Sequence, residues 1–183
     1  MLNVLVMGLG RGKMLAGEAH TSEQLRLAGA IDPDAARLRA VADELGLAPE
    51  RTFASLAEAL KATSAEMLVV ATPTRLHVEH VRAGLAAGMH VLCEKPLTTD
   101  RAEAGALRDA ARQADRQLAV VQNSRYGKHF RTCRELLAAG AIGELRCAYH
   151  RFSRWRPVGQ MGHRHALLSA ACDPHYSYVF HTV

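Results

Sequence analysis

The chain has 183 residues, 49% of them hydrophobic and 22% charged, and this ordinary globular composition excludes an intrinsically disordered protein. Its length suffices for one well-buried domain and part of a second. The formal net charge is +5, with a dense basic group at Arg146, Arg151, Arg154, Arg156 and Arg164. Because no recognition motif accompanies this charge, we expect a solvated or partner-facing basic surface and no nucleic-acid partner.

The cysteines are not spaced as C-x-x-C pairs, so we expect neither a zinc ribbon nor a disulfide framework from Cys93, Cys133, Cys147 and Cys172. This usage fits a reducing compartment, and we expect a cytoplasmic protein. The amino terminus has no basic segment before its apolar run, and no apolar run approaches the roughly 20 residues of a membrane span. We therefore expect neither a targeting segment nor a membrane partner.

Short apolar runs alternate with helical stretches up to residue 122. Strands are expected at residues 2–7, 25–31, 51–53, 67–71, 90–93 and 118–122. Helices are expected from near Lys13, over 34–45, after a capping box at Ser55 and Glu58, over 75–87 and over 100–114. Strict alternation predicts an α/β fold with a doubly wound parallel sheet, whose ligand-binding edge collects the loops that follow the strands.

The pattern changes after residue 122. Residues 123–127 are rich in turn formers, residues 128–139 read as a helix, and residues 144–152 alternate like a strand that could start a different sheet. We therefore expect two domains, residues 1–123 and residues 124–183, the second being an incomplete start. Whether residues 157–183 are ordered, or arise from a shifted reading frame, stays open.

Glycines follow the first expected strand at Gly8, Gly10 and Gly12, where backbone amides at a helix amino end can face a pyrophosphate. The third position of the G-x-G-x-x-G pattern is Lys13. Either Gly12 serves as the third glycine with a one-residue adjustment, or the helix lies slightly farther from the strand. Alone, the pattern also fits a plain tight turn.

Asp32 ends the second expected strand, where a carboxylate can accept hydrogen bonds from both ribose hydroxyls of an adenosine. Its alternative role is that of a turn residue before Pro33. The glycines and this acid together predict a dinucleotide site. The acid favours NAD over NADP, because a 2′-phosphate would meet like charge.

Two further loops carry polar residues to the same edge. Thr72 and Pro73 follow the fourth strand, where a loop would cross the middle of the cofactor, and His77 is either a cofactor contact or a solvent contact at the helix start. Glu94 and Lys95 follow the fifth strand. Lys95 is therefore a candidate for proton chemistry, unless it is an ordinary surface lysine.

These residues together resemble the Gfo/Idh/MocA oxidoreductases, the family of glucose-fructose oxidoreductase and inositol dehydrogenase. The resemblance covers about residues 1–152 and depends most on Glu-Lys-Pro at residues 94–96, at its distance from the Thr-Pro at residues 72–73. The other matching segments are 8–10, Asp32, 74–77, 122–126 and 136–144.

The resemblance implies a Rossmann domain followed by an α+β domain that supplies the substrate pocket and usually the contact of a homo-oligomer. It also implies hydride transfer between nicotinamide and a hydroxyl carbon of a sugar or cyclitol. Lys95 would bind the reacting hydroxyl and help to move its proton, with Glu94 near the nicotinamide and Pro96 often after a cis bond. An ammonium group beside a developing alkoxide stabilises it.

On this resemblance we expect NAD, with NADP the less favoured alternative, and no metal. The expected cofactor contacts are Gly8, Leu9, Gly10, Arg11, Asp32, Thr72, Pro73, His77, Glu94 and Lys95. The expected substrate contacts are Lys95, Arg125 and Tyr126.

One part of the family pattern is broken. Relatives carry an aspartate followed four residues later by a histidine, and the corresponding positions here are Ala170 and Pro174. The sequence has Asp173 and His175 instead, two residues apart and off one helix face. The catalytic pair is absent or displaced. We therefore expect a truncated relative that binds cofactor without turnover, in which the oligomer is doubtful.

Other functions stay open. A non-catalytic module that senses nucleotide or sugar, or a subunit completed by another chain, would keep the same nucleotide-binding fold. An S-adenosylmethionine methyltransferase also uses a glycine-rich turn and an acid after the second strand, but the spacing of residues 72–73 and 94–96 speaks against it. A metal site is disfavoured by irregular spacing of the histidines His163, His165, His175 and His181.

Overall fold

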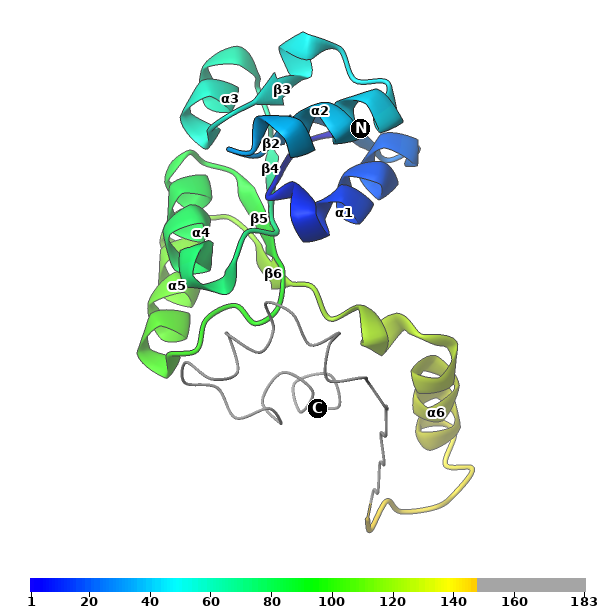
Figure 1. Cartoon of the computed structure of the whole chain (residues 1–183). Coiled ribbons are helices and arrows are strands. Elements are labelled where there is room, and N and C mark those ends of the chain that lie inside the picture. Colours follow the sequence, from blue (N-terminus) through cyan, green and yellow to red (C-terminus); the bar gives the residue numbers. More distant parts are fainter. Residues whose placement is uncertain (148–183) are drawn as a thin grey trace, which may run out of the picture. The chain divides into compact units, whose positions relative to one another are not determined.

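The computed structural model describes residues 1–147 of the chain. Residue contacts divide the chain into two units, Met1–Val121 and Gln122–Val183. Each unit is treated by itself. The first unit holds the sheet and most of the predicted site residues (Figure 1).

The first unit is built on a six-stranded sheet in which every pair of neighbouring strands is parallel. The strands are β1 (Leu2–Met7), β2 (Leu25–Ile31), β3 (Thr52–Phe53), β4 (Met67–Val70), β5 (His90–Cys93) and β6 (Leu118–Val120). Their order across the sheet is β3-β2-β1-β4-β5-β6. This is the Rossmann order and confirms the predicted doubly wound sheet. The chain reverses direction across the sheet between β1 and β4, which is where such folds bind ligands.

Helices connect the strands. They are α1 (Leu9–Thr21), α2 (Ala35–Leu45), α3 (Leu56–Ala62), α4 (His77–Ala86) and α5 (Arg101–Gln113), with short 3-10 turns η1 (Pro49–Arg51) and η2 (Thr74–Leu76). Side-chain oxygens cap several of these helices: Asp34 caps α2, Ser55 caps α3 and Asp100 caps α5. The Ser55 hydroxyl accepts the backbone N–H of Glu58, which confirms the first half of the predicted capping box. The Glu58 carboxylate accepts the N–H of Ala54 and not that of Ser55.

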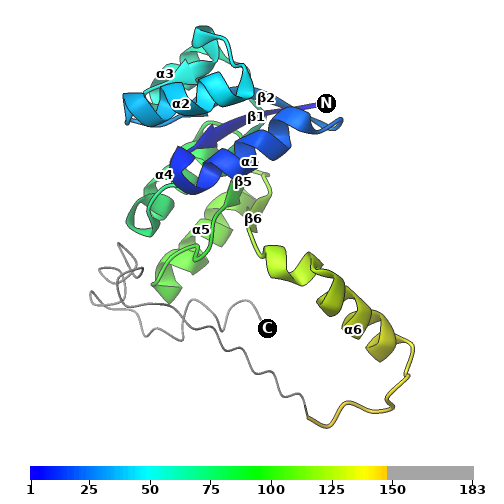
Figure 2. The same ribbon diagram turned by 45° about the vertical axis from the view of Figure 1, so that its right-hand side comes forward.

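Two apolar cores cover the two faces of the sheet. Alternate residues of β1 point to opposite faces, so Leu5 packs with α3, α4 and α5 while Val4 packs with α1 and α2. Figure 2 shows α1 and α2 on one side of the strands and α4 and α5 on the other. The central strands are buried on both faces, which explains why their sequences read as continuous apolar runs.

The structure corrects one element boundary that matters for the site. A helix beginning near Lys13 was the expectation, whereas α1 begins at Leu9, directly after β1. The reason is Gly8, which caps the helix in a left-handed conformation that turns the chain into the helix at once. Gly10 and Gly12 therefore belong to the first turn of the helix.

The described part of the second unit is mostly helical. It contains η3 (Asn123–Tyr126) and α6 (Lys128–Ala138). Apolar side chains are exposed on and after α6, at Phe130, Leu136, Leu137, Ile142 and Leu145. The expected strand at residues 144–152 is not present over residues 144–147, and residues 148–152 lie outside the described part. Gly140 and Gly143 both have positive φ, and Gly140 ends α6 because it directly follows the cap residue Ala139.

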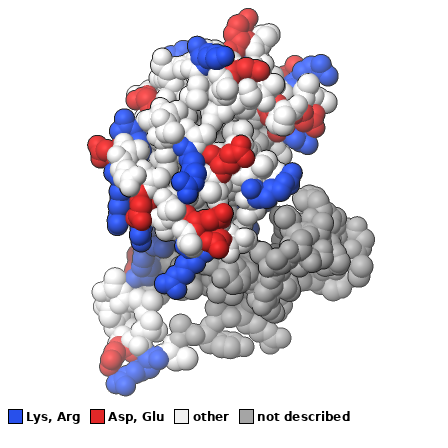
Figure 3. Space-filling view, turned by 90° about the vertical axis from the view of Figure 1, so that its left-hand side faces the viewer, with Lys and Arg blue, Asp and Glu red and all other residues white. Residues whose placement is uncertain are grey.

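Charges are mixed on the face of the first unit that α4 and α5 cover. Figure 3 shows basic and acidic side chains interspersed there, without a continuous basic stripe on that face. None of the helices in residues 1–147 is long and apolar enough to cross a membrane.

Candidate functional site

Four loops meet at the carboxyl edge of the sheet. Gly8 follows β1, Asp32 follows β2, Thr72 follows β4 and Glu94 follows β5, and these four strands are neighbours. Backbone hydrogen bonds join them: the Gly8 N–H donates to Ile31 at 2.8 Å, and the Glu94 N–H donates to Val70 at 2.8 Å. The structure therefore brings the predicted residues of the first unit to one edge.

Gly8 is at the tightest point of this edge. Its φ is +89°, and a β-carbon there would lie 2.6 Å from the backbone nitrogen of Thr72 and 2.7 Å from the carbonyl of Ala71. No side chain fits, since the obstructing atoms are backbone. Gly8 thus lets the loop after β1 touch the loop after β4 directly.

The amino end of α1 fits an anionic group. Within α1 no acidic residue lies in the first turn, and Gly8 offers no side-chain cap; the Asp32 carboxylate accepts only the first amide, that of Leu9. A β-carbon at Gly10 would meet no atom of the described residues within 4 Å, so this position is open, and Arg11 beside it is exposed. A helix amino end with open access is suited to a diphosphate.

Gly12 takes the role of the third glycine of the pattern, whose position is occupied by Lys13. A β-carbon at Gly12 would lie 3.0 Å from that of Ala71 and 3.2 Å from a methyl group of Val6. Gly12 is therefore the glycine that allows α1 to pack closely on the sheet, and the helix does not stand off.

Asp32 is buried, with 3% of its surface exposed. One carboxylate oxygen accepts the backbone N–H of Leu9 at 2.8 Å, and the other accepts that of Asp34 at 2.9 Å. The guanidinium group of Arg37 approaches both oxygens, at 3.1 and 3.3 Å. Asp32 thus ties the end of β2 to the start of α1, and sequence reasoning did not anticipate Arg37.

His77 is not the solvent contact that was one of its two expected roles, because only 1% of its surface is exposed. Its Nε2 lies 2.8 Å from the carbonyl oxygen of Thr72, and its Nδ1 lies 2.8 Å from that of Pro96. His77 therefore bridges the loop after β4 to the loop after β5. With both ring nitrogens used in this way, we assign it to positioning these loops.

His80 is a site residue that the sequence did not reveal. Its Nδ1 lies 2.9 Å from the hydroxyl oxygen of Thr72, so His77 and His80 hold the same threonine by its carbonyl and its side chain. Burial lowers the pKa of His80, and this favours its neutral form. The sequence signal that could have revealed His80 is its three-residue spacing from His77, which places both histidines on one face of α4.

The segment after β5 is held by its own contacts. Glu94 is buried at 9% exposure, and its carboxylate accepts the backbone N–H of Lys95 at 3.1 Å. Lys95 is half-buried, and the bond to Pro96 is cis, as the resemblance implies. The preceding Cys93 is fully buried, which raises the pKa of its thiol to about 12.

The other predicted residues lie in the second unit, in the loop after β4 or beyond residue 147. Arg125 and Tyr126 belong to η3 of the second unit, where both are exposed. Pro73 is exposed in the loop after β4. Asp173 and His175, like the histidines considered for a metal, lie outside the described residues. Within residues 1–147, no group of three or more metal-ligating side chains gathers.

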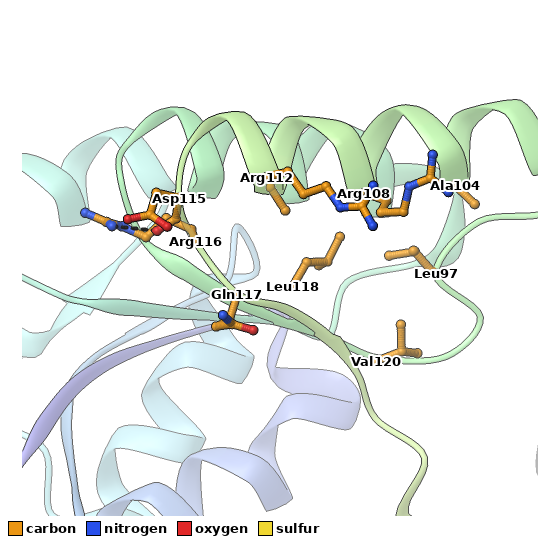
Figure 4. A pocket seen from close by; sticks show the side chains of 10 residues that line it. Leu97, Ala104, Arg108, Arg112, Asp115, Arg116, Gln117, Leu118 and Val120 are labelled. Carbon is orange, nitrogen blue, oxygen red and sulfur yellow. Dashed lines mark hydrogen bonds between the residues drawn. The ribbon is translucent and has the colours of Figure 1, made fainter.

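A separate hollow of about 470 Å³ lies between α5 and β6 (Figure 4). Leu97, Leu118 and Val120 form its apolar side, and arginines of α5 extend over it. None of its lining residues is a predicted cofactor contact.

Comparison with known proteins identifies the family. The family model for the Gfo/Idh/MocA oxidoreductases, described as an oxidoreductase family with an NAD-binding Rossmann fold, matches residues 2–122. The chain belongs to this family. Inositol 2-dehydrogenase of Leifsonia xyli is 42% identical over 118 residues, which are 63% of this chain and 33% of that enzyme. The NADP(+)-dependent scyllo-inositol 2-dehydrogenase of Bacillus subtilis is 35% identical over 95 residues, or 52% of this chain and 26% of the enzyme.

Solved structures share the fold. A probable dehydrogenase from Thermotoga maritima superposes with a TM-score of 0.72 at 29% identity, over 78% of this chain and 42% of that one. The chain thus spans about a third of the length of the inositol 2-dehydrogenase, and less than half of that solved structure.

Proposed function

We propose that this chain binds NAD at the carboxyl edge of β1, β2, β4 and β5. The observation that carries the proposal is the joint presence of the open helix start at Gly10 and the buried carboxylate of Asp32 at neighbouring strand ends. The N–H groups of Gly8 and Leu9 already donate to Ile31 and Asp32 and shape the loop. Gly10 and Arg11 would then bind the diphosphate, and Asp32 the adenosine ribose. The family match supports the same assignment.

The preference for NAD over NADP is supported by the charge of Asp32. A 2′-phosphate at the adenosine ribose would come close to a buried carboxylate, which disfavours it. One similar enzyme is named for NADP(+), so the preference is a property of these residues and not of the family as a whole.

The proposed parental chemistry is dehydrogenation of a sugar or cyclitol hydroxyl, as in the inositol dehydrogenases that this chain resembles. Bound nicotinamide supplies the hydride acceptor. Lys95 would bind the reacting hydroxyl and take its proton, while Glu94 positions the backbone of Lys95 through their hydrogen bond. Thr72 and Pro73 would contact the cofactor from the loop after β4, with His77 bridging that loop to Pro96.

We further propose that the chain binds cofactor without sugar turnover. On the family pattern, counted on from residues 165–168, the aspartate and histidine of the proton relay would fall at Ala170 and Pro174, whose side chains cannot exchange a proton. The same substitution favours the second candidate function, a non-catalytic nucleotide-binding or partner subunit. A reducing location such as the cytoplasm is supported by the free cysteines Cys93, Cys133 and Cys147.

The test is calorimetry with the full chain. Titration with NADH is expected to show saturable binding, whereas S-adenosylmethionine should not bind. Absence of NADH binding at millimolar concentration would contradict the proposal.

Turnover is tested separately with NAD and myo-inositol. We expect no formation of NADH. If NADH does form, the proposal of inactivity is wrong, and Lys95→Met then tests the assigned base. Lys61→Met on α3 is the matched control, since Lys61 is exposed and distant from the edge in sequence.

A further inference from the structure

Arg37 is held between two carboxylates at the proposed ribose end of the site. Its Nη1 donates to Asp32 at 3.1 and 3.3 Å, and its Nη2 lies 3.1 Å from a carboxylate oxygen of Asp34. The Arg37 side chain is 46% exposed, whereas that of Asp32 is 3% exposed. The Asp34 side chain is 44% exposed, so burial fixes only Asp32 in this cluster.

Asp34 is fixed because it is the amino-terminal cap of α2. One carboxylate oxygen accepts the backbone N–H groups of Ala36 and Arg37 at 3.0 and 3.1 Å, and the other oxygen remains for the guanidinium group. The hydrogen bond from the Arg37 N–H, followed by the charge of that residue, lowers the pKa of Asp34. Asp34 is thus ionised at neutral pH and anchored to the helix.

In this arrangement the side chain of Arg37, which could bind a phosphate, contacts the carboxylate of Asp32 instead. A guanidinium group is well suited to the oxygens of a phosphate, and Arg37 is the basic residue that contacts Asp32. Two carboxylates and one guanidinium group leave one uncompensated negative charge, which disfavours a 2′-phosphate.

We propose that Asp34 determines the cofactor selectivity of this chain, by holding Arg37 on Asp32 and away from a 2′-phosphate. Asp34 is a positioning residue in this role, because it acts through Arg37. The inference rests on the proposed binding of NAD and names a residue that sets the choice between NAD and NADP.

The test is the substitution Asp34→Asn. Asparagine caps helices as well as aspartate does, so α2 keeps its cap while the charge that holds Arg37 is lost. In calorimetry the dissociation constant for NADPH should fall roughly tenfold, which corresponds to about 1.4 kcal/mol. Binding of NADH should change less than roughly twofold, and the gain for NADPH should shrink as salt is added.

Two further variants isolate the cause. Asp43→Asn removes the same charge from an exposed position of the same helix and should leave both affinities unchanged. In an Arg37→Gln background, Asp34→Asn should give no gain for NADPH, because the cation that it releases is absent. Thermal melting of each variant shows that the fold is retained.

The outcomes separate the two proposals. If the wild type binds NADH but Asp34→Asn leaves the NADPH affinity unchanged, the inference is overturned and the proposed function stands. A gain that persists without Arg37 also overturns it, as does a wild type that binds NADPH more tightly than NADH. If a folded wild type binds neither nucleotide, the proposed function fails and the inference fails with it.

Discussion

Replacing Gly8 and Gly10 by alanine, one at a time, separates the stability of the sheet edge from its binding function. At Gly8 the new methyl group would lie 2.6 Å from a backbone nitrogen, and the residue would keep a φ of +89°. Such a backbone conformation costs a non-glycine residue about 1–3 kcal/mol. Overpacking against backbone that cannot rotate away adds about 1–3 kcal/mol more.

The expected loss for Gly8→Ala is therefore about 2–6 kcal/mol, out of a total that is typically about 5–15 kcal/mol. For a domain of this size, the Tm should fall by roughly 10 °C or more. At Gly10 the methyl group meets no described atom within 4 Å, and the residue lies within α1. Alanine there should leave the Tm unchanged or raise it, because alanine favours a helix by about 1 kcal/mol over glycine.

Gly10→Ala, the variant that keeps its stability, is the one expected to bind NADH poorly. Gly10→Ala should retain its fold but weaken NADH binding, because the methyl group takes the space where the diphosphate would approach the helix. Thermal melting followed by calorimetry measures both quantities on the same sample. A Gly8→Ala variant as stable as the wild type, or a Gly10→Ala variant that is equally destabilised, would refute the reasoning.

Three further predictions concern buried side chains. His77→Leu removes the ring contacts to the carbonyl oxygens of Thr72 and Pro96. Because an unsatisfied buried group costs about 1–3 kcal/mol, urea unfolding should show a loss of about 1–3 kcal/mol. A loss under about 0.5 kcal/mol would contradict the bridge. Burial lowers the pKa of His80 in the folded chain, so the unfolded chain binds more protons as the pH drops through 6.5, and the folded state loses stability. His80→Gln should therefore reduce the fall in Tm between pH 7 and pH 5. An unchanged pH profile of Tm would contradict this role of His80. Cys93→Ala should not change the number of thiols that react rapidly with Ellman's reagent, because burial raises the pKa of Cys93 to about 12. Cys133→Ala should lower the number of rapidly reacting thiols by one, because Cys133 is exposed. Rapid labelling of Cys93 would contradict the burial of β5.

Most of the fold was predictable because its strands are short apolar runs, of which the central β1 and β4 are buried on both faces. The apolar runs that became β4 (Met67–Val70) and β5 (His90–Cys93) stand out without any alternation, and helical stretches separate them from their neighbours. That pattern allows few arrangements other than a parallel sheet. The positions of Asp32 and Lys95 at its carboxyl edge follow from the same pattern.

The errors and omissions come from interactions between distant residues. The start of α1 was misplaced because glycine is a poor helix former, whereas Gly8 acts as a left-handed cap and Gly12 packs against Ala71. His80 and Arg37 were missed because their roles depend on side-chain directions across loops. A sequence shows that such residues are near the site, but not which atoms they meet.

Binding of NADH to the full chain, measured by calorimetry in parallel for the wild type and Gly10→Ala, tests the central claim most directly. The account predicts saturable binding by the wild type, clearly weaker binding by a Gly10→Ala variant of equal Tm, and no binding of S-adenosylmethionine. No heat of binding at millimolar NADH for a folded wild type, or equal affinities for the two proteins, would contradict a dinucleotide site at the amino end of α1.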